Sequence, residues 1–93
     1  MTRFSGQNPD EVEALATQLD ARAIDIDSLI STLTERVHDT TWVGAERTRF
    51  EGEWTGPIAT TLHEVADSLR DAAENARSNA NEQRGRLAPV SVD

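Results

Sequence analysis

Two stretches of the chain carry apolar residues every three or four positions, and a short segment rich in poor helix formers separates them. In the first stretch the apolar residues are Val12, Leu15, Ala16, Leu19, Ala23, Ile26, Leu29, Ile30, Leu33 and Val37. In the second they are Phe50, Trp54, Ile58, Leu62, Val65, Leu69, Ala72 and Ala76. This spacing gathers apolar side chains on one face of an α-helix. The sequence therefore predicts an all-α chain with two amphipathic helices of similar length.

The ends of the first helix are marked by local sequence. Asn8 can cap free backbone N–H groups, and Pro9 suits the first helical position. The apolar repeat predicts that this helix ends near Val37–Asp39. Poor helix formers fill Thr40–Gly44, so we expect a turn there and a second helix from about Ala45.

The second stretch contains an internal irregularity and ends before the chain does. Gly56-Pro57 should disturb the helix, because Pro removes a hydrogen bond and its ring clashes with the preceding turn. We expect a kink or short break at Thr55–Pro57. The apolar repeat ends after Gln83, so the sequence predicts one helical domain over residues 1–83 and a flexible tail over residues 84–93.

Trp42 and Gly44 mark the predicted turn between the helices. Gly44 tolerates positive φ and lets the backbone bend there. Trp42 and Trp54 are the largest apolar side chains, and we expect both to pack at one end of a helical bundle. Two roles stay open for Trp42: it closes the core, or it also presents a recognition surface to a partner.

Two such helices fold naturally into an antiparallel hairpin, but their apolar stripes are too wide for one seam to cover. The remaining apolar surface predicts that two hairpins dimerise into a four-helix bundle. The residues expected at the partner interface are Val12, Leu15, Leu19, Ile26, Leu29, Leu33, Phe50, Trp54, Ile58, Leu62, Val65 and Leu69.

Composition argues against several other functions. A net charge of -8 at pH 7 is unfavourable for binding nucleic acid or anionic lipid. No apolar run approaches the roughly 20 residues needed to span a bilayer, so we expect no membrane insertion. We also expect no general secretory signal, because residues 1–6 lack an apolar core. The sequence thus predicts a soluble acidic protein.

Catalytic, cofactor and metal sites are not expected. The chain has no Cys, which removes thiolate ligands, and it has no Gly-rich phosphate loop. His38 and His63 both fall on outward helix faces without the neighbours that catalysis needs. Asp39 beside His38 keeps a weak metal site open as an alternative, and His38 near a helix C-terminus keeps a pH-sensing role open. The main prediction is a non-enzymatic protein.

Trp42-Val43-Gly44 at the bend, followed by Phe50 and Trp54 at helical spacing, resembles the WXG family of small type VII secretion proteins. The similarity to these early-secreted-antigen-like hairpins covers about residues 9–83. It implies pairing with an identical chain, with a sister WXG-like protein or with the helical domain of a toxin. It also implies contact with the type VII secretion machinery. The chain would then be a substrate, co-secreted partner or adaptor, secreted without a cleavable signal peptide.

One departure from the family pattern concerns export. The family's signal is a Tyr followed four residues later by Asp or Glu, near the end of the second helix. This chain has no Tyr, and Ser78 with Glu82 supplies only the spacing. Either a partner carries the signal, or the protein stays in the cytoplasm as an adaptor. The alternative from a different class is a cytosolic dimeric coiled-coil module that converged on this pattern.

Overall fold

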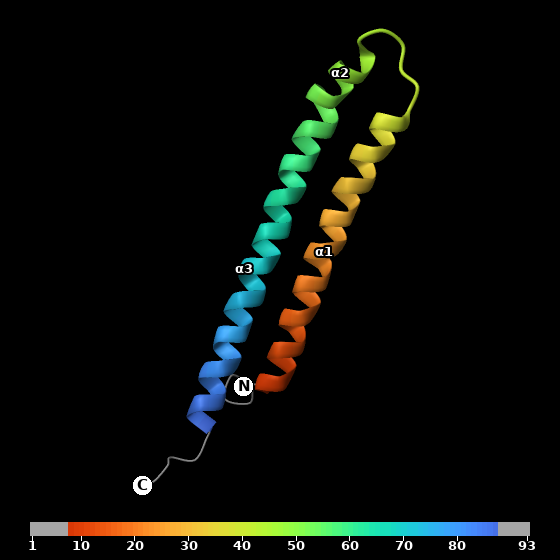
Figure 1. Cartoon of the computed structure of the whole chain (residues 1–93). Helices are drawn as coiled ribbons and strands as arrows, with labels where there is room; N and C mark the ends of the chain where they lie inside the picture. Colours follow the sequence, from red (N-terminus) through yellow and green to blue (C-terminus); the bar gives the residue numbers. More distant parts are fainter. Residues whose placement is uncertain (1–7, 88–93) are drawn as a thin grey trace.

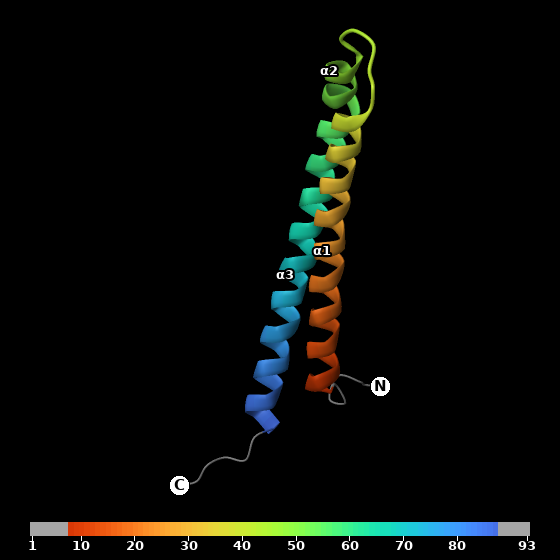
Figure 2. The same ribbon diagram turned by 45° about the vertical axis from the view of Figure 1, so that its right-hand side comes forward.

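Residues 8–87 are described by the computed structural model, with side chains through residue 85, and all regular structure in this range is helical. Helix α1 (Pro9–Asp39) runs along the molecule, and α3 (Gly56–Leu87) returns beside it in the opposite direction (Figure 1). The two helices stay side by side when the molecule is turned by 45° (Figure 2). The molecule is elongated, 75 × 24 × 18 Å. The predicted all-α antiparallel helical hairpin is confirmed, and its dimerisation stays a prediction.

Helix α1 begins where its sequence predicts. The side chain of Asn8 accepts a hydrogen bond of 2.8 Å from the backbone N–H of Asp10, and Pro9 occupies the first turn. Asp10 and Glu11 place negative charge at the positive end of the helix dipole. These local choices start the helix, and packing against α3 holds the rest of it.

Side chains from the turn satisfy the last carbonyl groups of α1. The backbone and hydroxyl groups of Thr40 both donate to the carbonyl of Arg36, at 3.0 and 2.6 Å. The indole N–H of Trp42 donates to the carbonyl of Val37 at 2.8 Å. Gly44 then adopts φ +62°, which a residue with a Cβ rarely does. Trp42 and Gly44 therefore both shape the turn.

The return helix begins with a short α-helix, α2 (Glu46–Phe50), and one π-helical turn, η2 (Glu51–Thr55), before α3 starts. The second helix thus begins one residue after the predicted position of Ala45. No gap separates these elements in Figure 1, so the return helix is continuous.

The π-helical turn lies directly before Pro57, which explains its position. An α-helix would force the Pro57 ring against the carbonyl of Glu53, and a wider turn relieves that crowding. The N–H of Gly56 donates five residues back to the carbonyl of Glu51, and a Cβ at Gly56 would lie 3.0 Å from that oxygen. The irregularity predicted at Thr55–Pro57 is therefore a widened turn slightly earlier in the chain, and the helix is not interrupted.

The helices meet along a narrow seam with a seven-residue repeat. On α1 the buried residues are Ala16, Ala23, Ile30 and Val37, with the half-buried Val12, Leu19, Ile26 and Leu33 between them. On α3 the buried residues are Ala66, Ala73 and Ala80, with the half-buried Ala59, Leu62, Leu69, Ala76 and Gln83 between them. These residues are called the seam below. Their alternating spacing of three and four is that of a two-helix coiled coil.

Alanine occupies most of the fully buried positions, and this corrects the sequence analysis in one respect. The apolar stripe predicted for the second helix did not include Ala66, Ala73 and Ala80, whereas these residues form its buried centre on α3. Small side chains let two helices approach closely, but each buried methyl group contributes only about 0.8 kcal/mol. No large side chain among the described residues is fully buried. The hairpin therefore has a thin core for its length.

The return helix extends beyond the point where the sequence analysis ended it. Helix α3 continues past Gln83 to Leu87, and Arg84 makes contacts with α1. Arg84, which directly follows the seam residue Gln83, is held against α1 by its ion pairs with Asp10 and Glu13. The remainder of the predicted tail, residues 88–93, lies outside the described residues.

Candidate functional site

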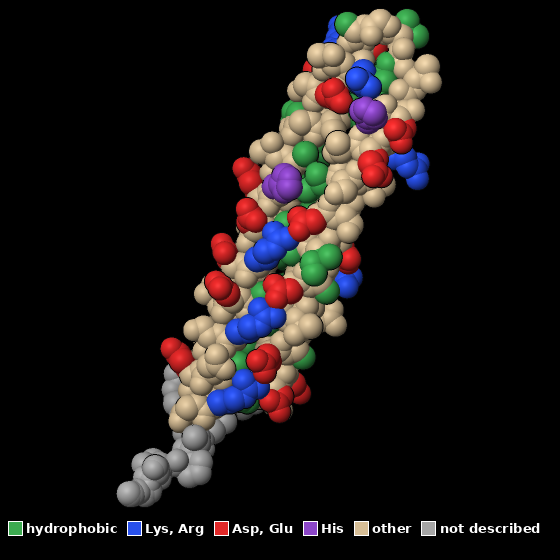
Figure 3. Space-filling view, viewed as in Figure 1, with side chains coloured by type: hydrophobic (Ala, Val, Ile, Leu, Met, Phe, Trp, Pro, Cys, Tyr) green, Lys and Arg blue, Asp and Glu red, His purple; other side chains and the backbone are tan. Residues whose placement is uncertain are grey.

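One long side of the hairpin is a row of ion pairs between the helices. This polar edge consists of Glu13, Asp20 and Asp27 of α1 and Arg70, Arg77 and Arg84 of α3. Arg77 contacts Asp20 at 2.6 Å, and Arg70 pairs with Asp27 one heptad nearer the turn. The space-filling view shows basic side chains in a row along the hairpin, with acidic side chains on both sides (Figure 3). This side of the molecule pairs its own charges.

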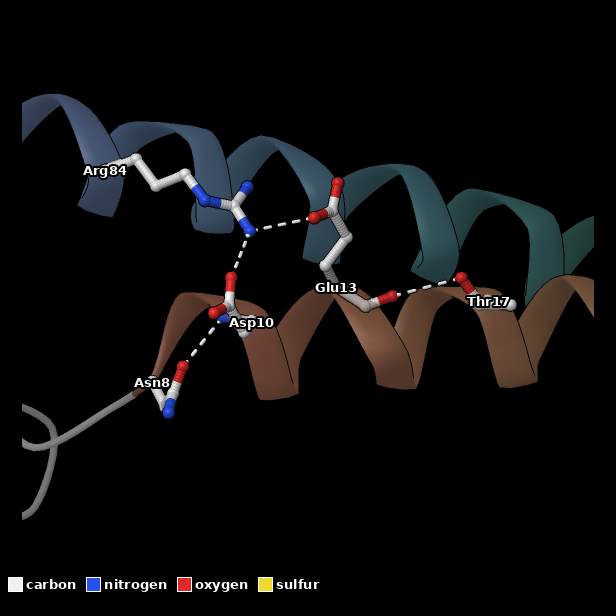
Figure 4. Close-up of polar contacts among 5 residues, drawn as sticks. All are labelled: Asn8, Asp10, Glu13, Thr17 and Arg84. Atoms are coloured by element: carbon white, nitrogen blue, oxygen red, sulfur yellow. Dashed lines mark hydrogen bonds and ion pairs between the residues drawn. The ribbon is translucent and has the colours of Figure 1, made fainter.

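The last ion pairs of the polar edge join the start of α1 to the end of α3. From α3, the Arg84 guanidinium donates to both Asp10 and Glu13 of α1, at 2.8 Å each (Figure 4). The hydrogen bond to Asp10, then that to Glu13, raises the pKa of Arg84 above its ordinary value. Because the pKa is raised, the charged guanidinium stabilises the folded hairpin at every pH below the ordinary pKa of Arg. This stabilisation is lost only when the pH rises through the raised pKa. This contact therefore persists across the neutral pH range.

The opposite long side of the hairpin is apolar and exposed. On both helices, the residues on this side directly precede the buried seam residues or Ala59. The residues of the polar edge instead directly follow half-buried seam residues. This apolar edge consists of Leu15 and Leu29 of α1, and Ile58, Val65 and Ala72 of α3. Leu15 and Leu29 are each 53% exposed, and Val65 is 43% exposed. A partner that excluded water here would bury these large aliphatic side chains, and each one buried would stabilise the complex.

Charge is unevenly placed along the apolar edge. From Ile58 to Asn79, the residues of α3 at this side are Ile58, Thr61, Val65, Ser68, Ala72, Asn75 and Asn79, and none is charged. The α1 side carries Arg22 and Arg36, and Arg22 pairs with Asp25 at 3.2 Å. In a protein with a net charge of -8, this uncharged strip is the place where another acidic surface meets the least repulsion.

Three aromatic side chains gather at the turn end of the hairpin, called the tip here. The rings of Trp42 and Phe50 lie 5.3 Å apart between centroids, at 35°, and both residues are half-buried. Trp54 is 56% exposed, so the expectation that it packs into the bundle end does not hold within one hairpin. An exposed Trp is among the side chains that contribute most when a protein partner covers them.

Two hollows lie at the tip and share the residues Glu53 and Trp54. The apolar hollow, of about 330 Å³, is lined by Glu53, Trp54, Pro57, Ile58, Thr61 and Leu62. The acidic aromatic hollow, of about 220 Å³, is lined by Trp42, Glu46, Arg49, Phe50, Glu53 and Trp54. The apolar hollow continues the apolar edge, because Ile58 belongs to both.

The residues predicted for a partner interface divide into two groups. Val12, Leu19, Ile26, Leu33, Leu62 and Leu69 line the seam and contact the other helix of the same hairpin. Leu15, Leu29, Ile58, Val65 and Trp54 lie exposed on the apolar edge or the tip. Phe50 packs against Trp42. The second group is the surface that remains available to a partner.

The ion pairs of the polar edge were not predicted from the sequence. A signal was present: three Arg residues stand seven apart on one helix, and three acidic residues stand seven apart on the other. Matching heptad spacing of opposite charges on two antiparallel helices indicates pairing across the seam.

The histidines do not gather with other possible ligands. His38 Nδ1 lies 3.4 Å from Asp39, both side chains are exposed, and His63 is exposed on α3. Within the described range, no group of three or more His, Cys, Asp or Glu side chains is placed to hold a metal ion. No helix in this range is long and apolar enough to cross a membrane.

No protein-family model matches the chain, and neither a curated protein nor a solved structure matches it. The surfaces of this hairpin that bear on function are therefore its two edges and its tip.

Proposed function

We propose that this protein is a non-enzymatic helical binding protein whose apolar edge pairs with a second helical hairpin to form a four-helix bundle. The single observation that carries the proposal is the exposure of Leu15, Leu29, Ile58 and Val65 along one side of a hairpin with a thin core. A second hairpin placed on that side removes these side chains from water.

A second copy of the chain is the first partner to test. Two copies would meet through the uncharged strip of α3, whereas any approach through the acidic back of α3 would oppose Glu64, Asp67, Asp71 and Glu74 to the same residues. A sister hairpin or a toxin's helical domain would use the same edge, with apolar side chains of its own.

Sedimentation velocity over a concentration series tests this binding function. We expect a dimer in the micromolar range. A folded monomer throughout that range, with no partner hairpin able to shift it, would overturn the proposal. Chain that folds or stops aggregating only when a sister hairpin is added would identify the heterodimer.

From the resemblance to WXG proteins, we infer that this binding function belongs to type VII secretion and that the chain acts there as a substrate, a co-secreted partner or an adaptor. Since the chain lacks Tyr, we expect export to depend on a bound partner with an intact signal. The test is secretion from a type VII-competent cell, with and without the candidate partner. Retention in both conditions would support the alternative of a cytosolic adaptor. Efficient export alone would show that another signal suffices.

A further inference from the structure

The acidic aromatic hollow at the tip has the chemistry of a site for a positively charged side chain. Trp42, Phe50 and Trp54 supply ring faces, which attract cations, and Glu46 and Glu53 supply carboxylates beside them. The indole N–H of Trp42 is already bonded to the carbonyl of Val37, which fixes the ring in place. A cation entering this hollow therefore meets one ring, that of Trp42, whose position is already fixed by a hydrogen bond.

The protein's own cation near this hollow is only weakly held. Arg49 Nε lies 3.7 Å from Glu53, and the two side chains are 70% and 63% exposed. Exposed ion pairs of this kind contribute about 0.2–1 kcal/mol. The side chain of Arg49 can therefore swing away at small cost, leaving the Glu53 carboxylate to an incoming partner.

The two hollows are spaced to suit one helix. On the return helix, the residues lining the acidic aromatic hollow centre near Phe50, and those lining the apolar hollow centre near Pro57. Seven residues of a helix span about 10.5 Å, or roughly two turns. A partner helix lying alongside presents side chains seven apart at the same spacing.

We propose that the tip binds one face of a partner helix that carries an aliphatic side chain and, two turns away, an Arg or Lys. The aliphatic side chain fills the apolar hollow, and the basic one enters the acidic aromatic hollow. This inference rests on the proposed function, because it names the chemistry of the helix that the hairpin binds. It adds a charged anchor at the tip to a surface that is otherwise apolar.

The probe is a synthetic helix-forming peptide of Ala and Gln with one Leu and one Arg seven residues later, and its twin with citrulline in place of Arg. Trp42 and Trp54 are the two Trp residues of the chain, and both line the acidic aromatic hollow. Their fluorescence therefore reports occupancy directly. We expect a saturable change with the Arg peptide and about two- to fivefold weaker binding by the citrulline peptide.

Matched variants locate the effect. The double variant Glu46→Gln with Glu53→Gln should weaken binding of the Arg peptide and leave binding of the citrulline peptide unchanged. Glu64→Gln with Glu74→Gln removes the same charge from the back of α3 and should change neither affinity. Circular dichroism of each variant checks that the hairpin is folded.

Three results would overturn the inference: equal affinity for both peptides, equal loss in both double variants, or no saturable change. If any of these occurs while the chain still dimerises, the tip site is wrong and the apolar edge stands. If dimerisation is also absent at every concentration and with every partner, the proposed function fails as well.

Discussion

The polar edge and the apolar edge lie on opposite sides of the same two helices, and they leave the hairpin in opposite states. At the polar edge, Arg70, Arg77 and Arg84 of α3 each pair with a carboxylate on α1, and the contacts repeat every heptad. At the apolar edge, Leu29 and Val65 stand about half exposed although they flank the same seam. One edge is complete within one chain, and the other is not.

This difference assigns two roles to opposite sides of the hairpin: one side sets the register of the two helices, and the other is left for a partner. The polar edge favours one register of α1 on α3, because a slip by one residue would part every Arg from its carboxylate. The seam supplies close contact through small side chains. The apolar edge adds nothing to the register of the single hairpin, and its exposed side chains become favourable only when a partner covers them.

The largest expected effect is on the apolar edge. Val65→Glu would place a charge where the second hairpin should exclude water, and an unpaired buried charge costs about 3–5 kcal/mol. We expect at least about 100-fold weaker dimerisation with helicity retained, measured by sedimentation velocity and circular dichroism.

Asn81→Glu is the control for Val65→Glu. It adds the same charge at an exposed position of α3, between Arg77 and Arg84 in the helical repeat. The dimer should survive this change. Equal loss in the two variants would mean that net charge, and not the apolar edge, governs association.

A neighbouring pair of alanines separates the seam from the apolar edge. Ala73 is buried in the seam and Ala72 is exposed beside it. Ala73→Leu should force the helices apart and cost about 1–3 kcal/mol of the free energy of unfolding, which urea titration measures. Ala72→Leu should leave the unfolding of the hairpin unchanged or strengthen dimerisation. If Ala72→Leu were the more damaging change, the assignment of the seam would be wrong.

The smallest effect concerns one rung of the polar edge. Asp20 and Arg77 are both partly exposed, so their pair should contribute only about 0.2–1 kcal/mol. A double-mutant cycle with Asp20→Asn and Arg77→Gln measures this coupling, and added salt should reduce it. A coupling that salt leaves unchanged would show that the pair is more deeply desolvated than the structure indicates.

The sequence was sufficient for both helices and for the two ends of α1, because those ends depend on local chemistry. Asn8 and Pro9 start α1, and the turn at Gly44 follows from a residue that accepts positive φ. The end of α3 was misjudged because it depends on Arg84 reaching a carboxylate more than 70 positions earlier in the chain. Apolar periodicity carries no information about such a contact.

The division of the apolar stripe could not be predicted from the same pattern. Leu15 and Leu29 lie fourteen residues apart, which is two repeats of the seam. Periodicity alone therefore does not distinguish them from the residues that are buried. The helices instead pack closely through small Ala residues next to these positions, and the larger Leu side chains stay exposed. The exposure of Trp54 at the tip could not be predicted either, because it depends on the direction in which η2 turns its side chain.

The central claim is that the apolar edge is the side a second hairpin covers, and thiol accessibility tests it most directly. The chain has no Cys, so Ala72→Cys on the apolar edge and Ala14→Cys on an exposed face of α1 each introduce a single thiol. Alkylation rates are measured from dilute to concentrated protein, and with any partner hairpin. Ala72→Cys should react about fivefold more slowly at a total chain concentration of roughly ten times the dimer dissociation constant, while Ala14→Cys keeps its rate. Unchanged reactivity at position 72 in an assembled protein, or protection at position 14 instead, would contradict the account.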